Sequence, residues 1–139
     1  MESSVVRDYQ SRNHSKFLLK YHIIFVCKYR KNVLAYSRID DDMKQILFDI
    51  SRESDFDIEV MESDKDHLHM MVRCPPKLSP LSVVRRLKQE STVRIWRMHE
   101  ETLHRIYWRE RTFWTDGYFV SSVGNVSQET IKRYIENQG

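Results

Sequence analysis

At 139 residues, the chain has the length of one domain with a single hydrophobic core. Hydrophobic residues make up 40% of it and charged residues 31%, which excludes disordered and fibrous proteins. No apolar run is long enough for a transmembrane helix. The two cysteines, Cys27 and Cys74, lie far apart in apolar surroundings, which favours buried free thiols. We expect one soluble, cytoplasmic domain over residues 1–139 with no membrane contact and a flexible polar arm at residues 1–15.

The net charge of +3 hides a separation of charges along the chain. Residues 16–38 carry six basic side chains and no acidic one, whereas residues 40–66 carry eleven acidic against three basic side chains. Residues 85–111 then carry eight basic against four acidic side chains. Two basic zones around an acidic one are typical of a face that binds a polyanion, although ordinary solvated faces give the same pattern. From these zones we expect phosphate contacts by Lys28, Arg30, Arg85, Arg86 and Lys88.

The first half of the chain predicts a strand, a helix and a hairpin in that order. Residues 16–30 alternate between apolar and polar side chains, which indicates a long strand with His22 on its polar face. The acidic run 40–42 predicts the start of a helix, because carboxylates cap free N–H groups. Residues 55–62 alternate again, with Phe56, Ile58 and Val60 on one face, and a polar turn at 63–65 joins them to a second strand at 66–74. These two runs predict a β-hairpin.

The second half predicts two helices around one further strand. Ser79 before Pro80 is a strong helix start, and this helix should run to about residue 99 with Met98 on its buried side. A strand is expected within 111–124, and a last helix at 127–138 is capped by Ser127. The order β-α-β-β-α-β-α predicts an α+β two-layer sandwich: a ferredoxin-like antiparallel sheet with helices on one face, followed by a C-terminal helix that carries a tyrosine.

The run 66–72, DHLHMMV, places two histidines two residues apart. Because side chains alternate along a strand, His67 and His69 project together, while Leu68, Met70 and Val72 project into the core. Two neutral imidazoles can chelate a divalent ion, but a third protein ligand is required and none is close in the sequence. Packing of both histidines in the core is the alternative. A histidine-triad hydrolase is excluded because residue 71 is not a histidine. A two-histidine phosphoesterase is excluded because no histidine has Ser or Thr two residues later.

The last predicted helix places Tyr134 and Gln138 on one face, because they are four residues apart. A phenol with a pKa near 10 attacks phosphate only when it is oriented or activated. By itself, this helix favours a tyrosine that only packs.

Five motifs in order resemble the single-tyrosine HUH transposases of small insertion sequences, the family that acts on single-stranded DNA with REP-type or hairpin ends. The resemblance covers about residues 16–138. It depends on the segments YHIIFVCKYRKNVL, DHLHMMV, VVRRLKQES, FWTDGYFVSSVG and IKRYIENQ.

The resemblance implies that His67 and His69 bind a divalent metal ion, Mg²⁺ or Mn²⁺, that Gln138 completes this metal site, and that Tyr134 is the nucleophile. Two nitrogens and one amide oxygen suit Mn²⁺ better than Mg²⁺. The resemblance further implies a homodimer that cleaves and rejoins single-stranded DNA beside end hairpins through a 5′-phosphotyrosine bond, with no nucleotide cofactor. In such dimers the tyrosine helix of one subunit can meet the histidine pair of the other.

Two other functions stay open. A non-catalytic module that binds single-stranded nucleic acid on a ferredoxin-like sheet would use the same basic residues and would stack bases on Tyr29, Trp96 or Trp114. For Trp114, and for Tyr118 and Phe119, a place in the core is the alternative. A relaxase or replication-initiator nuclease would usually be longer and would often carry a third histidine.

Overall fold

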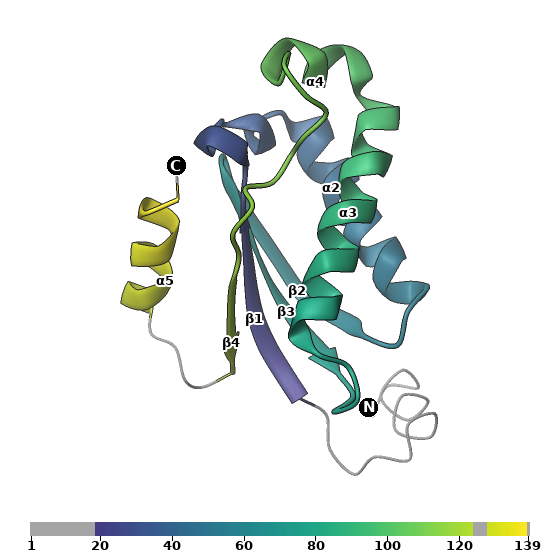
Figure 1. Ribbon diagram of the computed structural model, residues 1–139, viewed down its shortest axis with the longest axis vertical. Coiled ribbons are helices and arrows are strands. Elements are labelled where there is room, and N and C mark those ends of the chain that lie inside the picture. Colours follow the sequence, from purple (N-terminus) through teal and green to yellow (C-terminus); the bar gives the residue numbers. More distant parts are fainter. Residues whose placement is uncertain (1–18, 124–127, 139) are drawn as a thin grey trace.

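The structure of the protein is a computed structural model that describes residues 19–123 and 128–138. The predicted arm at 1–15 and the predicted cap Ser127 lie outside these ranges. Four strands form one antiparallel sheet in the order β2-β3-β1-β4 (Figure 1). The strands are β1 (Leu19–Val26), β2 (Asp57–Asp64), β3 (His67–Cys74) and β4 (Phe119–Ser122), and the helices are α2 (Ser37–Arg52), α3 (Pro80–Met98), α4 (Glu100–Ile106) and α5 (Gln128–Glu136).

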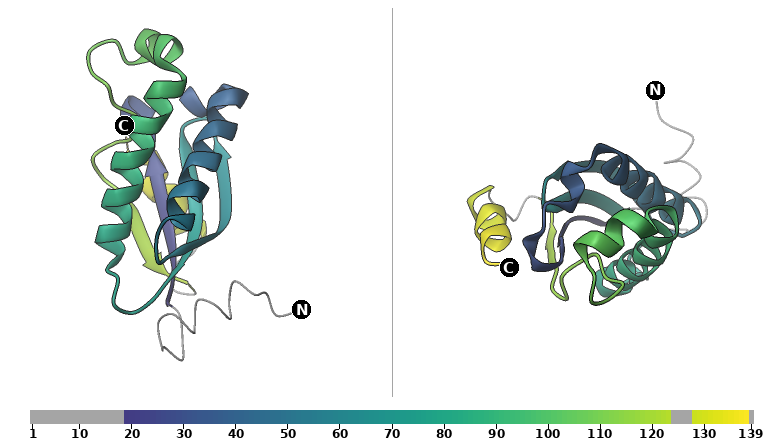
Figure 2. Two further views of the ribbon diagram at one scale, coloured as in Figure 1. Left: turned by 90° about the vertical axis from the view of Figure 1, so that its right-hand side faces the viewer. Right: turned by 90° about the horizontal axis from the view of Figure 1, so that it is seen from above.

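The helices lie on both sides of this sheet. Helices α2 and α3 cover one face, and α5 lies against the other face (Figures 1 and 2). The main core lies between the sheet and the helix pair, where apolar side chains of β1 and β3 meet those of α2 and α3. This arrangement confirms the predicted α+β sandwich with an antiparallel sheet. Within the described residues, no helix is both long and apolar enough to cross a bilayer.

Strand β1 is buried on both faces near its end and is shorter than predicted. Ile23 and Phe25 enter the main core, while Ile24 and Val26 are fully buried on the α5 side. The prediction of a strand up to residue 30 was wrong. After Cys27 the chain turns into the 3₁₀ segment η1 (Lys28–Arg30), in which Tyr29 and Arg30 have positive φ angles of 59° and 51°.

Helix α2 begins three residues before the acidic run that was predicted to open it. A second 3₁₀ segment, η2 (Val33–Ala35), leads directly into the helix at Ser37, so Asp40 lies inside the first turn. Its carboxylate does not cap the helix: it accepts a hydrogen bond from the Ser63 hydroxyl at 2.6 Å and pairs with Lys44 at 3.2 Å. Asp40 therefore stabilises the first turn from within.

The β2–β3 hairpin forms as predicted, with one irregularity. Its register shifts between Ile58 and Val60, which is the signature of a β-bulge. The extra residue turns Val60 away from the core, so it is exposed, although the alternation had placed it beside Ile58. The turn consists of Lys65 and Asp66, close to the predicted position.

Helix α3 begins at Pro80 as predicted, with the Ser79 hydroxyl accepting a hydrogen bond from the Ser82 amide at 3.1 Å. Met98 was placed on the buried side but is exposed, because the chain leaves α3 there and enters the short helix α4, which the sequence patterns had not indicated. Strand β4 falls within the predicted range 111–124.

Several aromatic side chains lie in the core or on the surface contrary to expectation. Trp96 and Trp114 are buried, so the suggestion that they stack bases was wrong, whereas the expected place of Trp114 in the core is confirmed. The indole nitrogens donate hydrogen bonds to the Thr112 carbonyl at 2.8 Å and the Ser91 hydroxyl at 3.0 Å. Tyr118, expected in the core, is exposed, and Phe119 is only half-buried, with its ring packed on Tyr134 of α5.

Candidate metal and nucleophile site

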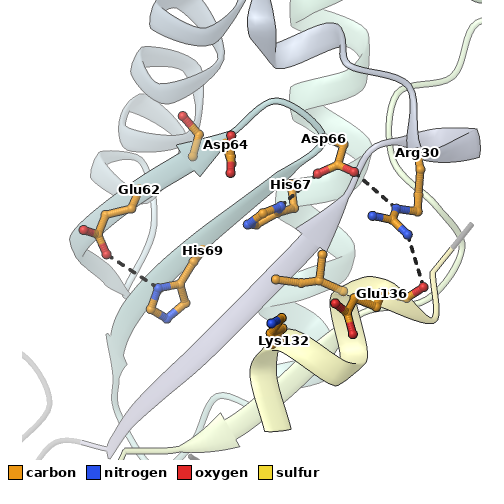
Figure 3. A pocket seen from close by; sticks show the side chains of 10 residues that line it. Arg30, Glu62, Asp64, Asp66, His67, His69, Lys132 and Glu136 are labelled. Carbon is orange, nitrogen blue, oxygen red and sulfur yellow. Dashed lines mark hydrogen bonds and ion pairs between the residues drawn. The ribbon is translucent and has the colours of Figure 1, made fainter. Parts of the chain in front are cut away.

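His67 and His69 lie side by side on the face of the sheet that α5 covers. Their neighbours Leu68, Met70 and Val72 are fully buried in the core, as the alternation predicts. Both imidazoles remain about one-fifth exposed, at 22%, in a cavity of about 490 Å³ between the hairpin and α5 (Figure 3). The cavity is lined by Arg30, Glu62, Ser63, Asp64, Asp66, His67, His69, Lys132, Ile135 and Glu136.

Asp66 holds His67 from the turn of the hairpin. Its Oδ1 lies 2.9 Å from His67 Nδ1, and its Oδ2 accepts a hydrogen bond from Arg30 Nε at 3.2 Å (Figure 3). Although burial raises the pKa of Asp66, the hydrogen bonds from His67 and Arg30 keep it below its usual value. An ionised Asp66 accepts the Nδ1 proton and leaves Nε2 of His67 as the basic nitrogen, the arrangement found behind many metal-binding histidines.

His69 has two neighbours, one on each side. The His22 ring of β1 stacks on it with ring centroids 5.0 Å apart, and His22 Nδ1 lies 2.8 Å from His69 Nε2. On the other side, Glu62 Oε1 lies 3.9 Å from His69 Nδ1. Burial and the repulsion from His22 lower the pKa of His69. A neutral imidazole with a free lone pair is the form that binds metals.

The charges around the pair favour a cation. Four carboxylates line the cavity, those of Glu62, Asp64, Asp66 and Glu136, against the two basic side chains of Arg30 and Lys132. Two imidazoles at the centre of such a cavity fit as two ligands of a divalent ion. Among the described residues, no group of three or more His, Cys, Asp or Glu side chains is placed to hold a metal ion.

Tyr134 and Gln138 lie together, as their spacing predicts, but at Gly117 rather than at the histidines. A Cβ atom built on Gly117 would lie 3.2 Å from Gln138 Oε1 and 3.7 Å from the Tyr134 hydroxyl. Gln138 Oε1 also accepts a hydrogen bond from the Thr115 hydroxyl at 3.4 Å, and the Tyr134 ring packs on Phe119 at 5.3 Å. The Tyr134 hydroxyl is buried and has no hydrogen-bond partner in the described part of the chain. This burial raises the pKa of Tyr134 to about 12.

Within one chain, α5 therefore turns one face to Gly117 and another to the histidines. The face at the cavity presents Lys132, Ile135 and Glu136 (Figure 3). The structure brings His67 together with His69, and Tyr134 together with Gln138, but it does not bring the two pairs together.

The five basic residues predicted to contact phosphates occupy different places. Arg30 lines the histidine cavity, and Lys28, two residues earlier in the chain, pairs with Asp116 at 3.4 Å. Lys88 is half-buried, and its ammonium donates to the carbonyls of Thr115 and Gly117, which secures the segment behind Tyr134. Burial lowers the pKa of Lys88. The other two lie on α3, across the sheet from α5: Arg85 is exposed and Arg86 pairs with Glu90 at 2.7 Å.

Three side chains of the site were not identified from the sequence. Asp66 directly precedes His67, so its role as an orienting carboxylate had a local signal. His22 was noted on the polar face of its strand, but its contact with His69 depends on the register of β1 against β3. Glu62 faces His69 because these residues are paired across the hairpin, which also depends on the register.

Comparison with known proteins places the chain in a family. The family model described as "Transposase IS200 like" matches residues 15–138. The chain is 31% identical over 131 residues to the transposase for insertion sequence element IS200 of Salmonella typhimurium, covering 94% of this chain and 84% of that protein. It is 28% identical over 122 residues to the ISDra2 transposase TnpA of Deinococcus radiodurans, covering 88% and 85% of the two chains.

Solved structures share the fold. The crystal structure of a candidate transposase from Deinococcus radiodurans R1 superposes with a TM-score of 0.81 at 29% identity, covering 89% of this chain and 93% of that one. The structure of a REP-associated tyrosine transposase bound to a REP hairpin has a TM-score of 0.54 at 12% identity, covering 89% and 68%, and shows likeness of fold alone. Given the match over nearly its whole length, the chain belongs to the IS200-like family of transposases.

Proposed function

We propose that this transposase cleaves and rejoins single-stranded DNA at the ends of an insertion sequence, with Tyr134 as nucleophile and a divalent metal ion at His67 and His69. The observation that carries the proposal is the cavity in which the two imidazoles lie among carboxylates and below the helix that bears Tyr134. Membership of the transposase family supports DNA as the substrate.

The chemistry is an exchange of phosphate esters. A metal ion held by His67, His69 and Gln138 would neutralise charge that develops on the phosphate oxygens. The Tyr134 hydroxyl attacks phosphorus, so that a bond from phosphorus to the phenolic oxygen forms and the bond to the DNA 3′ oxygen breaks. The phenol gives up its proton and the departing 3′ oxygen takes one up, so the strand leaves as a 3′-OH. Attack by another 3′-OH reverses the step, so rejoining needs no ATP.

The acidic lining of the cavity supports a role for the cation. A DNA phosphate that approaches the histidines meets four carboxylates, which repel it. With two basic side chains against these four carboxylates, a divalent ion would neutralise the local charge and give the phosphate a direct positive partner. Mn²⁺ is expected to bind more tightly than Mg²⁺, because two of the donors are imidazole nitrogens.

The position of Tyr134 implies that the site is completed by a rearrangement or by a second chain. With its hydroxyl buried at Gly117, the phenol is protonated and does not face the histidine cavity. We infer a homodimer in which α5 of one chain delivers Tyr134 and Gln138 to the histidines of the other. For the DNA we infer hairpin ends, in keeping with the hairpin bound by the REP-associated transposase of the same fold.

Covalent capture tests this function. Wild-type protein with Mn²⁺ and single-stranded DNA carrying end hairpins should give a protein–DNA adduct that survives a denaturing gel, whereas Tyr134→Phe should bind the DNA and give none. Tyr36→Phe changes an exposed tyrosine outside the site and should form the adduct normally. An adduct formed by Tyr134→Phe would refute the nucleophile. If wild-type protein forms no adduct on any strand, the chain is instead a non-catalytic binding module.

A further inference from the structure

A second hollow lies next to the histidine cavity and contains two exposed aromatic rings. It has a volume of about 250 Å³ and is lined by Tyr29, Lys31, Ile106, Tyr107, Trp108, Arg109, Glu110 and Thr112. Tyr29 is 57% exposed and Trp108 is 63% exposed. The volume is below the roughly 300 Å³ at which pockets for drug-sized ligands begin, so it suits one planar ring system.

The backbone holds Tyr29 in this hollow under strain. Tyr29 and Arg30 have φ angles of 59° and 51°, a left-handed conformation that is costly for residues other than glycine. The turn is fixed by hydrogen bonds from the Arg30 amide to the Cys27 carbonyl and from the Lys28 amide to the Phe113 carbonyl, both 2.8 Å. Strained residues of this kind cluster at ligand-binding sites, which marks the exposed Tyr29 ring as a candidate contact for a ligand.

Trp108 is presented from the opposite wall by a buried neighbour. The Tyr107 ring is buried, and its hydroxyl donates to the Lys28 carbonyl at 3.0 Å, which joins the two walls of the hollow. Trp108, the next residue, points outward. The Arg109 guanidinium lies 4.8 Å from its ring centroid, so a cation covers part of the indole while most of the side chain stays exposed.

The charges in the hollow suit a phosphate chain. Lys31 and Arg109 line it against one carboxylate, Glu110. Within the described ranges neither Lys31 nor Arg109 has a carboxylate at ion-pair distance, unlike Arg105 and Arg111 nearby, which pair with Glu101 and Glu100. Exposed aromatic rings beside unpaired cations are the elements with which proteins bind single-stranded nucleic acids.

The turn η1 connects the two cavities. Arg30 lines the histidine cavity, whereas its neighbours Tyr29 and Lys31 line the hollow. From these observations we propose that the hollow between Tyr29 and Trp108 binds one unpaired nucleobase of the DNA strand whose phosphates reach the histidine cavity. Lys31 and Arg109 contact the phosphates that flank this base. The site recognises the flat face of a base and not a base pair.

The site rests on the proposed function only in that single-stranded DNA is the ligand, and binding can be measured without cleavage. Of the three tryptophans, Trp96 and Trp114 are 1% and 5% exposed, so quenching of tryptophan fluorescence by added DNA reports on Trp108. The full chain with EDTA is titrated with an oligothymidine and with a strand of equal length built of abasic units. The oligothymidine should quench the fluorescence and the abasic strand, which has the same charge, should not.

Affinity variants then separate base binding from charge. By fluorescence anisotropy, Trp108→Ala and Tyr29→Ala should each raise the Kd for the oligothymidine roughly 5- to 100-fold and leave that for the abasic strand unchanged. Trp108→Phe keeps a ring and should bind nearly as wild type. Tyr36→Ala removes an exposed aromatic side chain from another surface and should have no effect.

Each result has one meaning. Equal losses on both strands in Trp108→Ala, or no quenching by the oligothymidine, would refute the base site. A chain that binds as described but never forms the Tyr134 adduct would contradict the proposed cleavage and leave the base site standing. If the wild type forms the adduct and Trp108→Ala binds oligothymidine as tightly as the wild type, the proposed function stands and the base site is refuted.

Discussion

Asp66 and His67 are neighbours in the chain and hydrogen-bonded partners at 2.9 Å, so the side chain that orients the histidine is supplied by the hairpin turn itself. Arg30 extends this contact in two directions. Its Nε binds Asp66, and its Nη1 donates to the Glu136 carbonyl at the end of α5 at 3.1 Å (Figure 3). One guanidinium thus contacts both the carboxylate behind the proposed metal ligand and the helix that carries the proposed nucleophile.

Removing the orienting carboxylate should weaken metal binding. Asp66→Ala frees the His67 ring to rotate and to change tautomer, so the Mn²⁺ affinity measured by calorimetry should fall about 10- to 100-fold. Asp66→Asn keeps an acceptor and should lose less. Asp41→Ala, an exposed carboxylate of α2 across the sheet, is the matched control and should bind as wild type. An unchanged Kd in Asp66→Ala would show that Asp66 does not position the ligand.

Ionisation of Tyr134 should report its burial. Burial raises the pKa of this phenol to about 12, from an ordinary value of 10.0. The difference between alkaline absorbance titrations of wild type and Tyr134→Phe should therefore show one tyrosine ionising near pH 12. The neutral phenol favours the docked helix, so this contribution to docking is complete below pH 10 and is lost as the pH rises toward 12. A midpoint near 10 would mean that Tyr134 is exposed in solution.

At the scale of elements, docking of α5 depends on the segment that precedes β4. Lys88 of α3 holds this segment from one side through the carbonyls of Thr115 and Gly117, and Tyr134 and Gln138 contact it from the other. Gly117 leaves room for the close approach, because a side chain longer than a methyl group would point at Tyr134 and Gln138.

A larger residue at this position should loosen the helix. In Gly117→Ala the new methyl group lies 3.2 Å from Gln138 Oε1, the end of a flexible side chain that can shift, so a small effect is expected. Gly117→Val adds a branched side chain and should displace the Tyr134 ring. Hydrogen exchange of the peptide 128–138 should then be several-fold faster than in Gly117→Ala, which serves as the control. Equal exchange in both variants would show that α5 does not depend on this contact.

Local sequence patterns predicted most of the helices and strands. They failed where contacts between distant parts of the chain determine the structure. Period-two alternation correctly put His67 and His69 on one face, and the spacing of four correctly put Tyr134 beside Gln138. The bulge at Val60, the strained turn at Tyr29 and helix α4 left no periodic signal. The site could not be predicted fully for the same reason. Contacts of α5 with Gly117 and Phe119 decide which face of this helix meets the histidines, and the spacing of residues within the helix does not show these contacts.

At the scale of the whole molecule, the two proposed halves of the active site lie on different surfaces of one chain. The histidines face Lys132 and Glu136 of their own α5, while Tyr134 faces Gly117. For the proposed site to form, either α5 rotates within its chain or α5 of a second chain supplies Tyr134. The two arrangements differ in which chain must carry each functional residue, and mixed dimers distinguish them.

Mixing two inactive variants should restore cleavage if the site is shared between chains. Tyr134→Phe keeps intact histidines and His67→Ala keeps an intact tyrosine, so a mixed dimer has one complete shared site and one that lacks both groups. After unfolding and refolding together in equal amounts, the adduct yield should reach about a quarter of wild type, because half of the dimers are mixed and each has one working site of two. Each variant refolded alone should give none. If every chain used its own tyrosine, no dimer in the mixture would hold a complete site, and the mixture would stay as inactive as its parts.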